Sequence, residues 1–152
     1  MTPRIGYAAG AFDLFHVGHL NLLRQAKAEC DFLVAGVVTD ELLVKTKGQP
    51  PIIPLAERLE IVRNIRFVDD AISEHLPRKI DTWRSNPFDV LFKGDDWRGT
   101  PKGLELERDF AAVGVDVVYF PYTVHTSSTA IRRTLELLNS DAQGWVPLQG
   151  IP

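Results

Sequence analysis

The chain has 152 residues, the size of one ordinary domain, and its 45% hydrophobic and 24% charged residues suit a globular protein with one sizeable core. Its net charge of −3, from 17 Lys and Arg against 20 Asp and Glu, argues against a general binder of nucleic acids or membrane surfaces. Cys30 is the only cysteine, which excludes an internal disulfide framework and a cysteine-rich zinc site. Because the first twenty residues lack an apolar signal core and no stretch is long enough to span a bilayer, we expect a cytoplasmic protein.

Five short apolar runs are predicted to be strands. In chain order they extend over Ile5 to Phe12, Phe32 to Val38, Val68 to Ile72, Phe88 to Phe92 and Val115 to Phe120. The second run is apolar on both faces, as a strand inside a parallel sheet must be.

Stretches with apolar residues at helical spacing lie between these runs. They extend over Val17 to Ala26, Leu55 to Ile65 after Pro54, Ile80 to Trp83, Leu104 to Ala111 before Gly114, and Ser128 to Leu138. Alternating strands and helices predict an α/β domain, residues 1–138, built on a doubly wound five-stranded parallel sheet, followed by a tail, residues 139–152. In such a sheet ligands bind beyond the carboxyl ends of the strands.

The first strand is followed by Gly10-Ala11-Phe12-Asp13-Leu14-Phe15-His16-Val17-Gly18-His19. Gly10 lets the backbone approach a ligand, and the two histidines lie on one side of the first helical turn. The free N–H groups and the dipole of that turn make a site for phosphate. A metal site lacks a third ligand nearby, while a purely structural turn with capping histidines remains an alternative.

The string Gly-x-Phe-Asp-x-x-His-x-Gly-His resembles the motif of the cytidylyltransferase family, within the larger His-x-Gly-His nucleotidyltransferase superfamily. Further matches follow in order along almost the whole chain: Val38 to Glu41, Lys45 with Lys47, Glu57-Arg58, Ile65 to Asp69, Lys93 to Trp97, and Thr126 to Arg132. The Lys93 to Trp97 segment is most similar to the glycerol-3-phosphate cytidylyltransferase branch. The resemblance implies a Rossmann-like nucleotidyltransferase (HUP-type) fold and, for most members, a homodimer.

The resemblance also implies that CMP passes from CTP to a phosphorylated alcohol by direct in-line attack, with release of pyrophosphate and with Mg²⁺ accompanying the triphosphate. It assigns catalysis to His16, His19, Lys45 and Arg132. It assigns nucleotide binding to Gly10, Ala11, Phe12, His16, His19, Lys47, Arg58, Gly94, Asp95, Trp97, Thr126, Ser127, Ser128 and Thr129. It assigns acceptor binding to Asp13, Asp40, Arg66 and Tyr122, and it assigns no residue to a dedicated metal site.

Plainer roles compete for several of these residues. Ser127 to Thr129 would suit an ordinary helix N-cap, the lysines and arginines a solvated face, and Trp97 a packing position. Asp13 would suit a residue that orients its loop, and we expect only surface or local hydrogen bonds for His75 and His125. A Ser-His-Asp hydrolase built on Ser127 and His125 lacks a nucleophile elbow.

The chain departs from the family pattern before its last helix. Tyr122 stands where the family has an arginine, and a tyrosine cannot replace the bidentate charged contact that arginine makes to phosphate; His125 replaces a glycine of the pattern and Ala11 a hydroxyl residue. Three alternatives therefore stay open: an adenylyltransferase of the same fold, which Arg132 favours; a cytidylyltransferase acting on a phosphonate or sugar phosphate; and a nucleotide-binding regulatory module without catalysis.

Overall fold

The computed structural model describes residues 2–122 and 125–141. Its five strands form one parallel sheet in the order β3-β2-β1-β4-β5. They are β1 (Ile5–Gly10), β2 (Phe32–Val38), β3 (Asp70–Glu74), β4 (Val90–Gly94) and β5 (Asp116–Phe120). The predicted doubly wound five-stranded sheet is therefore confirmed, with strand ends that differ from the apolar runs by a few residues.

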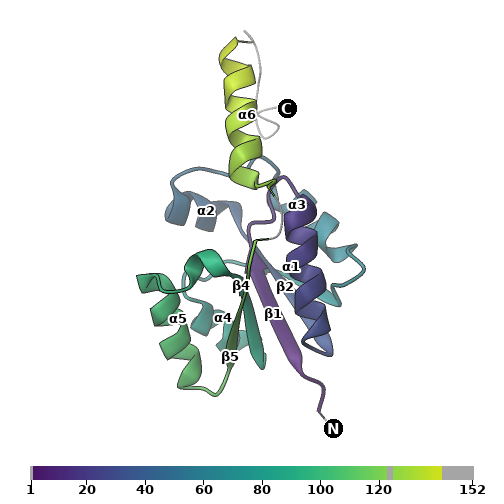
Figure 1. Ribbon diagram of the computed structural model, residues 1–152, viewed down its shortest axis with the longest axis vertical. Coiled ribbons are helices and arrows are strands. Elements are labelled where there is room, and N and C mark those ends of the chain that lie inside the picture. Colours follow the sequence, from purple (N-terminus) through teal and green to yellow (C-terminus); the bar gives the residue numbers. More distant parts are fainter. Residues whose placement is uncertain (1, 123–124, 142–152) are drawn as a thin grey trace.

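Helices cover both faces of this sheet (Figure 1). Helices α1 (Val17–Ala28) and α3 (Leu55–Arg63) pack on one face, and α4 (Lys79–Ser85) and α5 (Pro101–Ala111) pack on the other. Side chains of β1 alternate between the two cores: Ala8 joins Leu23 and Val62 on the first face, while Tyr7 joins Phe110 on the second. This alternation is what a strand buried on both sides requires.

Helix α2 (Asp40–Lys47) was not predicted from the sequence. It buries only Leu42 and Leu43, too few apolar positions to give a helical period. The signals that define it are its ends: the Thr39 side chain accepts a hydrogen bond from the Leu42 N–H, and Gly48 closes the helix at a φ of 78°. A helix this short can therefore be identified from its capping residues rather than from the periodicity of its apolar residues.

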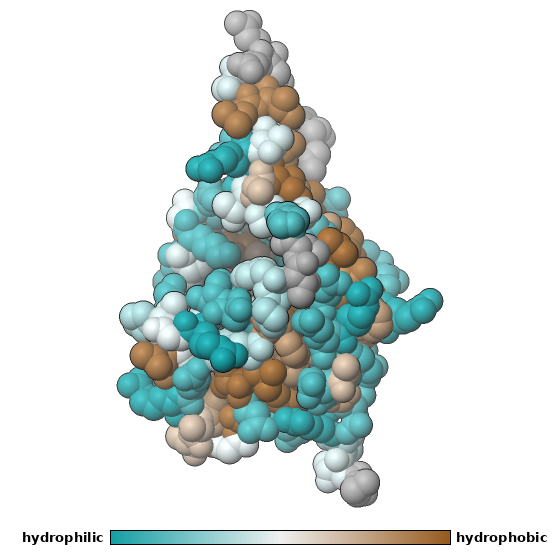
Figure 2. Space-filling view, viewed as in Figure 1, coloured by the Kyte–Doolittle hydropathy of each residue, from teal (hydrophilic) through white to brown (hydrophobic). Residues whose placement is uncertain are grey.

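Helix α6 (Ser128–Asp141) rises from the carboxyl-end edge of the sheet and projects away from the body of the molecule (Figure 1). Apolar side chains gather on it (Figure 2), and Leu137 and Leu138 are exposed. The helix runs past the predicted end of the domain at residue 138, and the rest of the predicted tail, residues 142–152, lies outside the described residues.

The direction of the strand order reverses at β1, between β2 and β4. At such a switch point the loops that follow neighbouring strands turn to opposite faces and leave a crevice between them. The loop after β1, the 3₁₀ turn η1 (Asp95–Trp97) after β4, and the start of α6 all lie at this carboxyl edge.

Candidate active site

The loop after β1 holds the two histidines in a reciprocal capping arrangement. His16 is the N-cap of α1, and its Nδ1 accepts a hydrogen bond from the Gly18 N–H at 3.0 Å. The Nδ1 of His19 accepts from the His16 N–H at 3.2 Å. The ring centroids lie 4.0 Å apart, so both imidazoles face the same space, as the three-residue spacing predicted.

These bonds fix where each neutral ring carries its proton. A ring nitrogen that accepts from an N–H group has no proton of its own, so in both histidines the proton is on Nε2. Burial lowers the pKa of His16, and burial followed by the neighbouring His16 lowers the pKa of His19 to about 4, against the opposing charge of Asp13. At neutral pH the site therefore presents two neutral Nε2–H donors.

The start of α6 meets this loop. Ser128 Oγ donates to the Asp13 carbonyl at 2.7 Å and lies 3.4 Å from His19 Nε2, which can donate to it. Ser127 caps α6, since its Oγ accepts from the Ala130 N–H at 3.0 Å. The plain N-cap is thus present, and the same segment brings its hydroxyls and free helix-start amides beside the histidines.

Asp13 holds the loop together from inside. Its side chain is buried, and its carboxylate accepts from the backbone N–H groups of Ile52 and Ile53 at 2.8 and 2.9 Å and from Arg132 at 2.9 Å. These contacts fit the orienting role rather than the acceptor-binding role expected from the resemblance. Arg132 is engaged by the same carboxylate, so it is not presented to a phosphate in this structure.

The loop between β1 and α1 also stores backbone strain. Phe12 and Leu14 both adopt left-handed backbone conformations, with φ of 52° and 51°. Residues with a Cβ take this conformation at a cost of about 1–2 kcal/mol each. The Phe12 ring packs edge-on against His19, with centroids 5.6 Å apart, so the strained residue helps to hold the imidazole in place.

A cavity of about 280 Å³ opens over the two imidazoles, and we call it the histidine cavity. It brings together most of the predicted nucleotide-binding residues: Gly10, Ala11, Phe12, His16, His19, Lys47, Gly94, Trp97, Thr126, Ser127, Ser128 and Thr129. Tyr122, a predicted acceptor-binding residue, also lines this cavity, and burial together with nearby Asp96 raises its pKa. Asp95 is not among the lining residues, whereas Asp96 is.

A second cavity of about 380 Å³ lies on the opposite side of the β1 and β4 ends, and we call it the lysine cavity. Its five cationic residues outnumber its three acidic ones; these are Lys47, Arg78, Lys79, Lys93 and Lys102, with Glu74, Glu105 and Asp109. Two ion pairs form within this set, Lys79 with Glu74 at 2.9 Å and Arg78 with Asp109 at 2.8 Å. The remaining positive charge suits an anionic ligand.

Sequence reasoning missed the lysine cavity almost entirely. Glu74 is buried, and it accepts from the Tyr7 hydroxyl at 2.8 Å as well as from Lys79; burial and this carboxylate raise the pKa of Tyr7. The signal was available in part, because Glu74 and Lys93 each stand at a strand's carboxyl end. No motif joins them, since they come from separate segments that only the sheet brings together.

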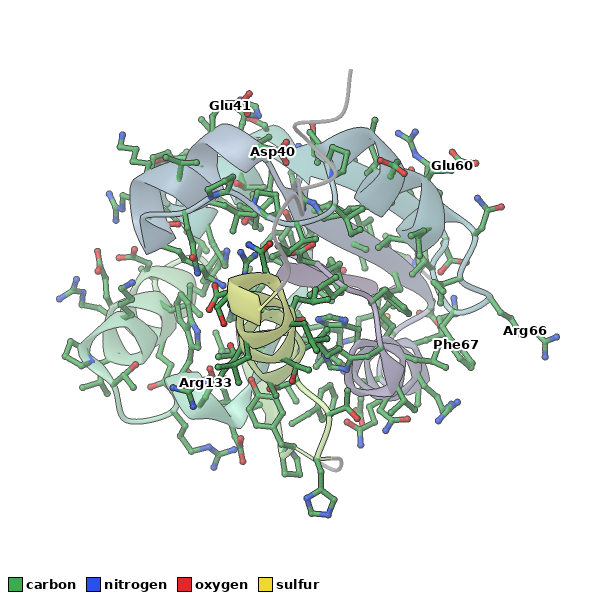
Figure 3. The ribbon with its side chains drawn as sticks, turned by 90° about the horizontal axis from the view of Figure 1, so that it is seen from above. Asp40, Glu41, Glu60, Arg66, Phe67 and Arg133 are labelled. Atoms are coloured by element: carbon green, nitrogen blue, oxygen red, sulfur yellow. The ribbon has the colours of Figure 1, made fainter. Side chains whose placement is uncertain are left out.

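Two arginines lie elsewhere than expected. The side chain of Arg58 is fully buried and donates to the carbonyls of Ile53, Ala11 and Val38 and to the carboxylate of Asp40. It therefore ties these loops together, and neither Arg58 nor Asp40 lines the histidine cavity or the lysine cavity. Arg66 precedes β3 at the opposite edge of the sheet and points outward (Figure 3), so the expected acceptor contact is not supported.

The two lysines of α2, Lys45 and Lys47, differ in whether they line a cavity. Both side chains are exposed, but Lys47 lines both cavities and Lys45 lines neither. The catalytic role expected for Lys45 is therefore better suited to Lys47.

Within residues 2–122 and 125–141, no three His, Cys, Asp or Glu residues gather closely enough to hold an ion. Among the same residues, no helix combines the length and apolar character that a membrane crossing requires.

The five-stranded parallel sheet with helices on both faces is the fold of the nucleotidyltransferase class of enzymes. Residues 7–134 match the family model described as cytidylyltransferase-like, and the chain belongs to that family.

Curated relatives carry several different names. The chain is 35% identical over 127 residues to glycerol-3-phosphate cytidylyltransferase of Bacillus subtilis, an alignment covering 83% of this chain and 92% of that protein. It is 36% identical over 114 residues to FAD synthase of Pyrococcus abyssi, covering 74% and 77%. It is 39% identical over 104 residues to ethanolamine-phosphate cytidylyltransferase of Arabidopsis thaliana, covering 65% of this chain but only 24% of that longer protein.

Among solved structures, the lipopolysaccharide core biosynthesis protein of Thermoplasma volcanium superposes with a TM-score of 0.69 at 26% identity, covering 82% of this chain and all of that one. Pantoate-beta-alanine ligase of Francisella tularensis superposes with a TM-score of 0.59 at 16% identity, covering 91% and 69%, and supports the fold alone.

Proposed function

We propose that the protein transfers CMP from CTP to a small phosphorylated alcohol, giving a CDP-alcohol and pyrophosphate. The observation that carries this proposal is a pair of cavities at the switch point of the sheet that share six lining residues, Ala9, Gly10, Ala11, Lys47, Lys93 and Trp97. A group-transfer enzyme needs two ligand sites that meet where the reacting atoms lie. The similarity to glycerol-3-phosphate cytidylyltransferase supports the choice of nucleotide and acceptor class.

The histidine cavity would hold the nucleotide. Its two Nε2–H donors would stabilise the charge on the α-phosphate, and the hydroxyls and amides at the start of α6 would hold the outer phosphates. Neutral donors suit this task because they need not gain or lose a proton as the charge moves. Asp96, Trp97 and Tyr122 line this cavity and are our candidates for nucleoside contacts.

The lysine cavity would hold the acceptor. An oxygen of the acceptor phosphate attacks the α-phosphorus, the new P–O bond forms, and the bond from the α-phosphorus to its bridging oxygen breaks in line with it. The electron pair leaves with pyrophosphate. The protein then acts by positioning the two substrates and neutralising their charge, with no covalent intermediate on the chain.

Mg²⁺ is proposed as a partner of the triphosphate rather than of the chain. Asp96 is the acidic residue among those lining the histidine cavity, which suits a cation held mainly by phosphate oxygens and water. When bound, the ion would reduce the negative charge that the attacking phosphate meets.

Adenylyl transfer from ATP is a second candidate function. It is favoured by the archaeal FAD synthases, which are about as similar to the chain as the cytidylyltransferases are. Arg132 is the residue of the sequence that favours ATP, but its side chain is held by Asp13. We therefore rank CTP first.

A screen of pyrophosphate release tests this choice. CTP and ATP are each paired with glycerol 3-phosphate, phosphoethanolamine, sugar phosphates, FMN and a phosphonate, with His16→Asn as the inactive control. We expect release with CTP and a phosphorylated polyol or sugar. Release with ATP alone would favour the adenylyltransferase, and nucleotide binding without release would favour a regulatory module.

A further inference from the structure

Lys93 lies where the two cavities meet. It is the fourth residue of β4, and it lines both the histidine cavity and the lysine cavity. Of the residues common to the two cavities, only Lys93 and Lys47 carry a charge. Lys47 is an exposed residue at the last turn of α2, whereas the backbone of Lys93 is held in the sheet, where it pairs with β5. Lys93 therefore presents the positionally fixed cation at the junction.

The Lys93 ammonium has no carboxylate of its own among the described residues. Its Nζ lies 4.0 Å from the centroid of the Trp97 ring and forms no ion pair within residues 2–122 and 125–141. The buried carboxylate of Glu74, whose charge acts on Lys93, already accepts from Tyr7 and Lys79. An ammonium placed against an aromatic face and beside an open cavity can accept an anionic ligand without first breaking a salt bridge.

The charged groups around Lys93 come from five elements. Glu74 at the end of β3 and Asp96 in η1 favour its protonated form, while Lys79 on α4 and Lys47 on α2 oppose it. Lys102 on α5 approaches the same Trp97 ring, at 6.0 Å. Burial first, and then Lys79, lowers the pKa of Lys93 to about 7. Binding of phosphate would restore the full positive charge.

We propose that Lys93 is a catalytic residue whose ammonium contacts the acceptor phosphate and the nucleotide α-phosphate together as they react. This inference rests on the proposed function. Two anionic groups must approach within bonding distance, and a cation located between them offsets their repulsion at the moment when the P–O bond forms. Lys93 keeps its proton throughout, so it acts by charge and not as a general base.

Lys93→Met and Lys93→Arg test the proposal, with Lys27→Met as the matched control. Lys27 pairs with Asp69 beside the start of β2, at the edge of the sheet opposite to the cavities. We expect Lys93→Met to lower kcat at least ~10²-fold while the Kd for CTP changes less than ~3-fold. Lys93→Arg should recover part of the loss, and Lys27→Met should retain wild-type kcat. Unchanged Kd for CTP also reports that the variants are folded.

The pH profile separates this role from a structural one. Because the protonated form acts, wild-type kcat/KM for the acceptor should fall as the pH rises through about 7. This fall in kcat/KM should be absent in Lys93→Met and should occur at higher pH in Lys93→Arg. If kcat/KM of Lys93→Met falls with pH as it does in wild type, or if Lys93→Met keeps the wild-type kcat, the inference is overturned while the proposed function stays intact. A wild-type enzyme that releases no pyrophosphate with any acceptor would overturn both.

Discussion

The two histidines show how one side chain serves structure and chemistry through its two ring nitrogens. In each imidazole Nδ1 accepts a backbone N–H, and Nε2 is left with the proton. Asparagine can imitate the first function because its side-chain oxygen lies near the position of Nδ1, but it cannot reach the position of Nε2. The two functions can therefore be separated by substitution.

We predict that His16→Asn lowers turnover at least ~10²-fold while the free energy of unfolding changes little, because asparagine is a good N-cap. His16→Ala should lose the same turnover and about 1 kcal/mol of stability as well. Steady-state pyrophosphate release and urea unfolding measure the two effects. Near-normal turnover in His16→Asn would refute a role for Nε2.

The lowered pKa of His19 predicts how stability depends on pH. In the unfolded chain the imidazole takes up a proton below its ordinary pKa of 6.5, but in the folded chain it does so only below about 4. The contribution of the neutral His19 ring to the free energy of unfolding is therefore complete above pH 6.5 and is lost as the pH falls toward 4. Urea unfolding at pH 7 and pH 4.5 should show wild type losing on the order of 2 kcal/mol more than His19→Asn; equal losses would contradict the burial of a neutral ring.

At the scale of elements, the lysines of α2 offer a matched pair on one helix. We predict that Lys47→Met lowers kcat/KM about 10- to 100-fold, because a charge-assisted contact to phosphate contributes about 1.5–3 kcal/mol. Lys45→Met should remain within ~3-fold of wild type, since Lys45 lines neither cavity. The reverse order of effects would show that the triphosphate lies along the other side of α2.

The sheet could be predicted because strands that are buried on both faces have continuous apolar sequences, such as Phe32 to Val38. Helix α2 could not, because it rests on its caps and buries only two leucines. The histidine cavity followed from the rule that ligands bind after strand ends. The direction of a long charged side chain does not follow from that rule: packing turns Arg58 inward beneath the site and leaves Arg66 outside it.

For the whole molecule, Arg58 is the point where the site and the fold are joined. Its guanidinium links the ends of β1 and β2, the start of α2, and the loop before α3. The loop after β1 therefore depends on a buried cation that lines neither cavity. The homodimer expected from the resemblance stays a prediction.

We predict that Arg58→Met destabilises the protein by about 3–5 kcal/mol, because it leaves buried carbonyls and the Asp40 carboxylate without their donor. Arg63→Met is the control on the same helix, where the exposed side chain makes a single long hydrogen bond to Ala71, and it should cost less than about 1 kcal/mol. Thermal unfolding compares the two. Similar stabilities for both variants would contradict the structural role of Arg58.

We infer that nucleotide and acceptor occupy separate cavities that meet at the carboxyl ends of β1 and β4. A crystal structure with a non-hydrolysable CTP analogue and Mg²⁺ tests it most directly, through the position of the α-phosphorus. We predict an α-phosphate oxygen within hydrogen-bond distance of Nε2 of His16 or His19, with the outer phosphates at the start of α6. A triphosphate bound in the lysine cavity, or imidazoles that contact no phosphate, would contradict the account.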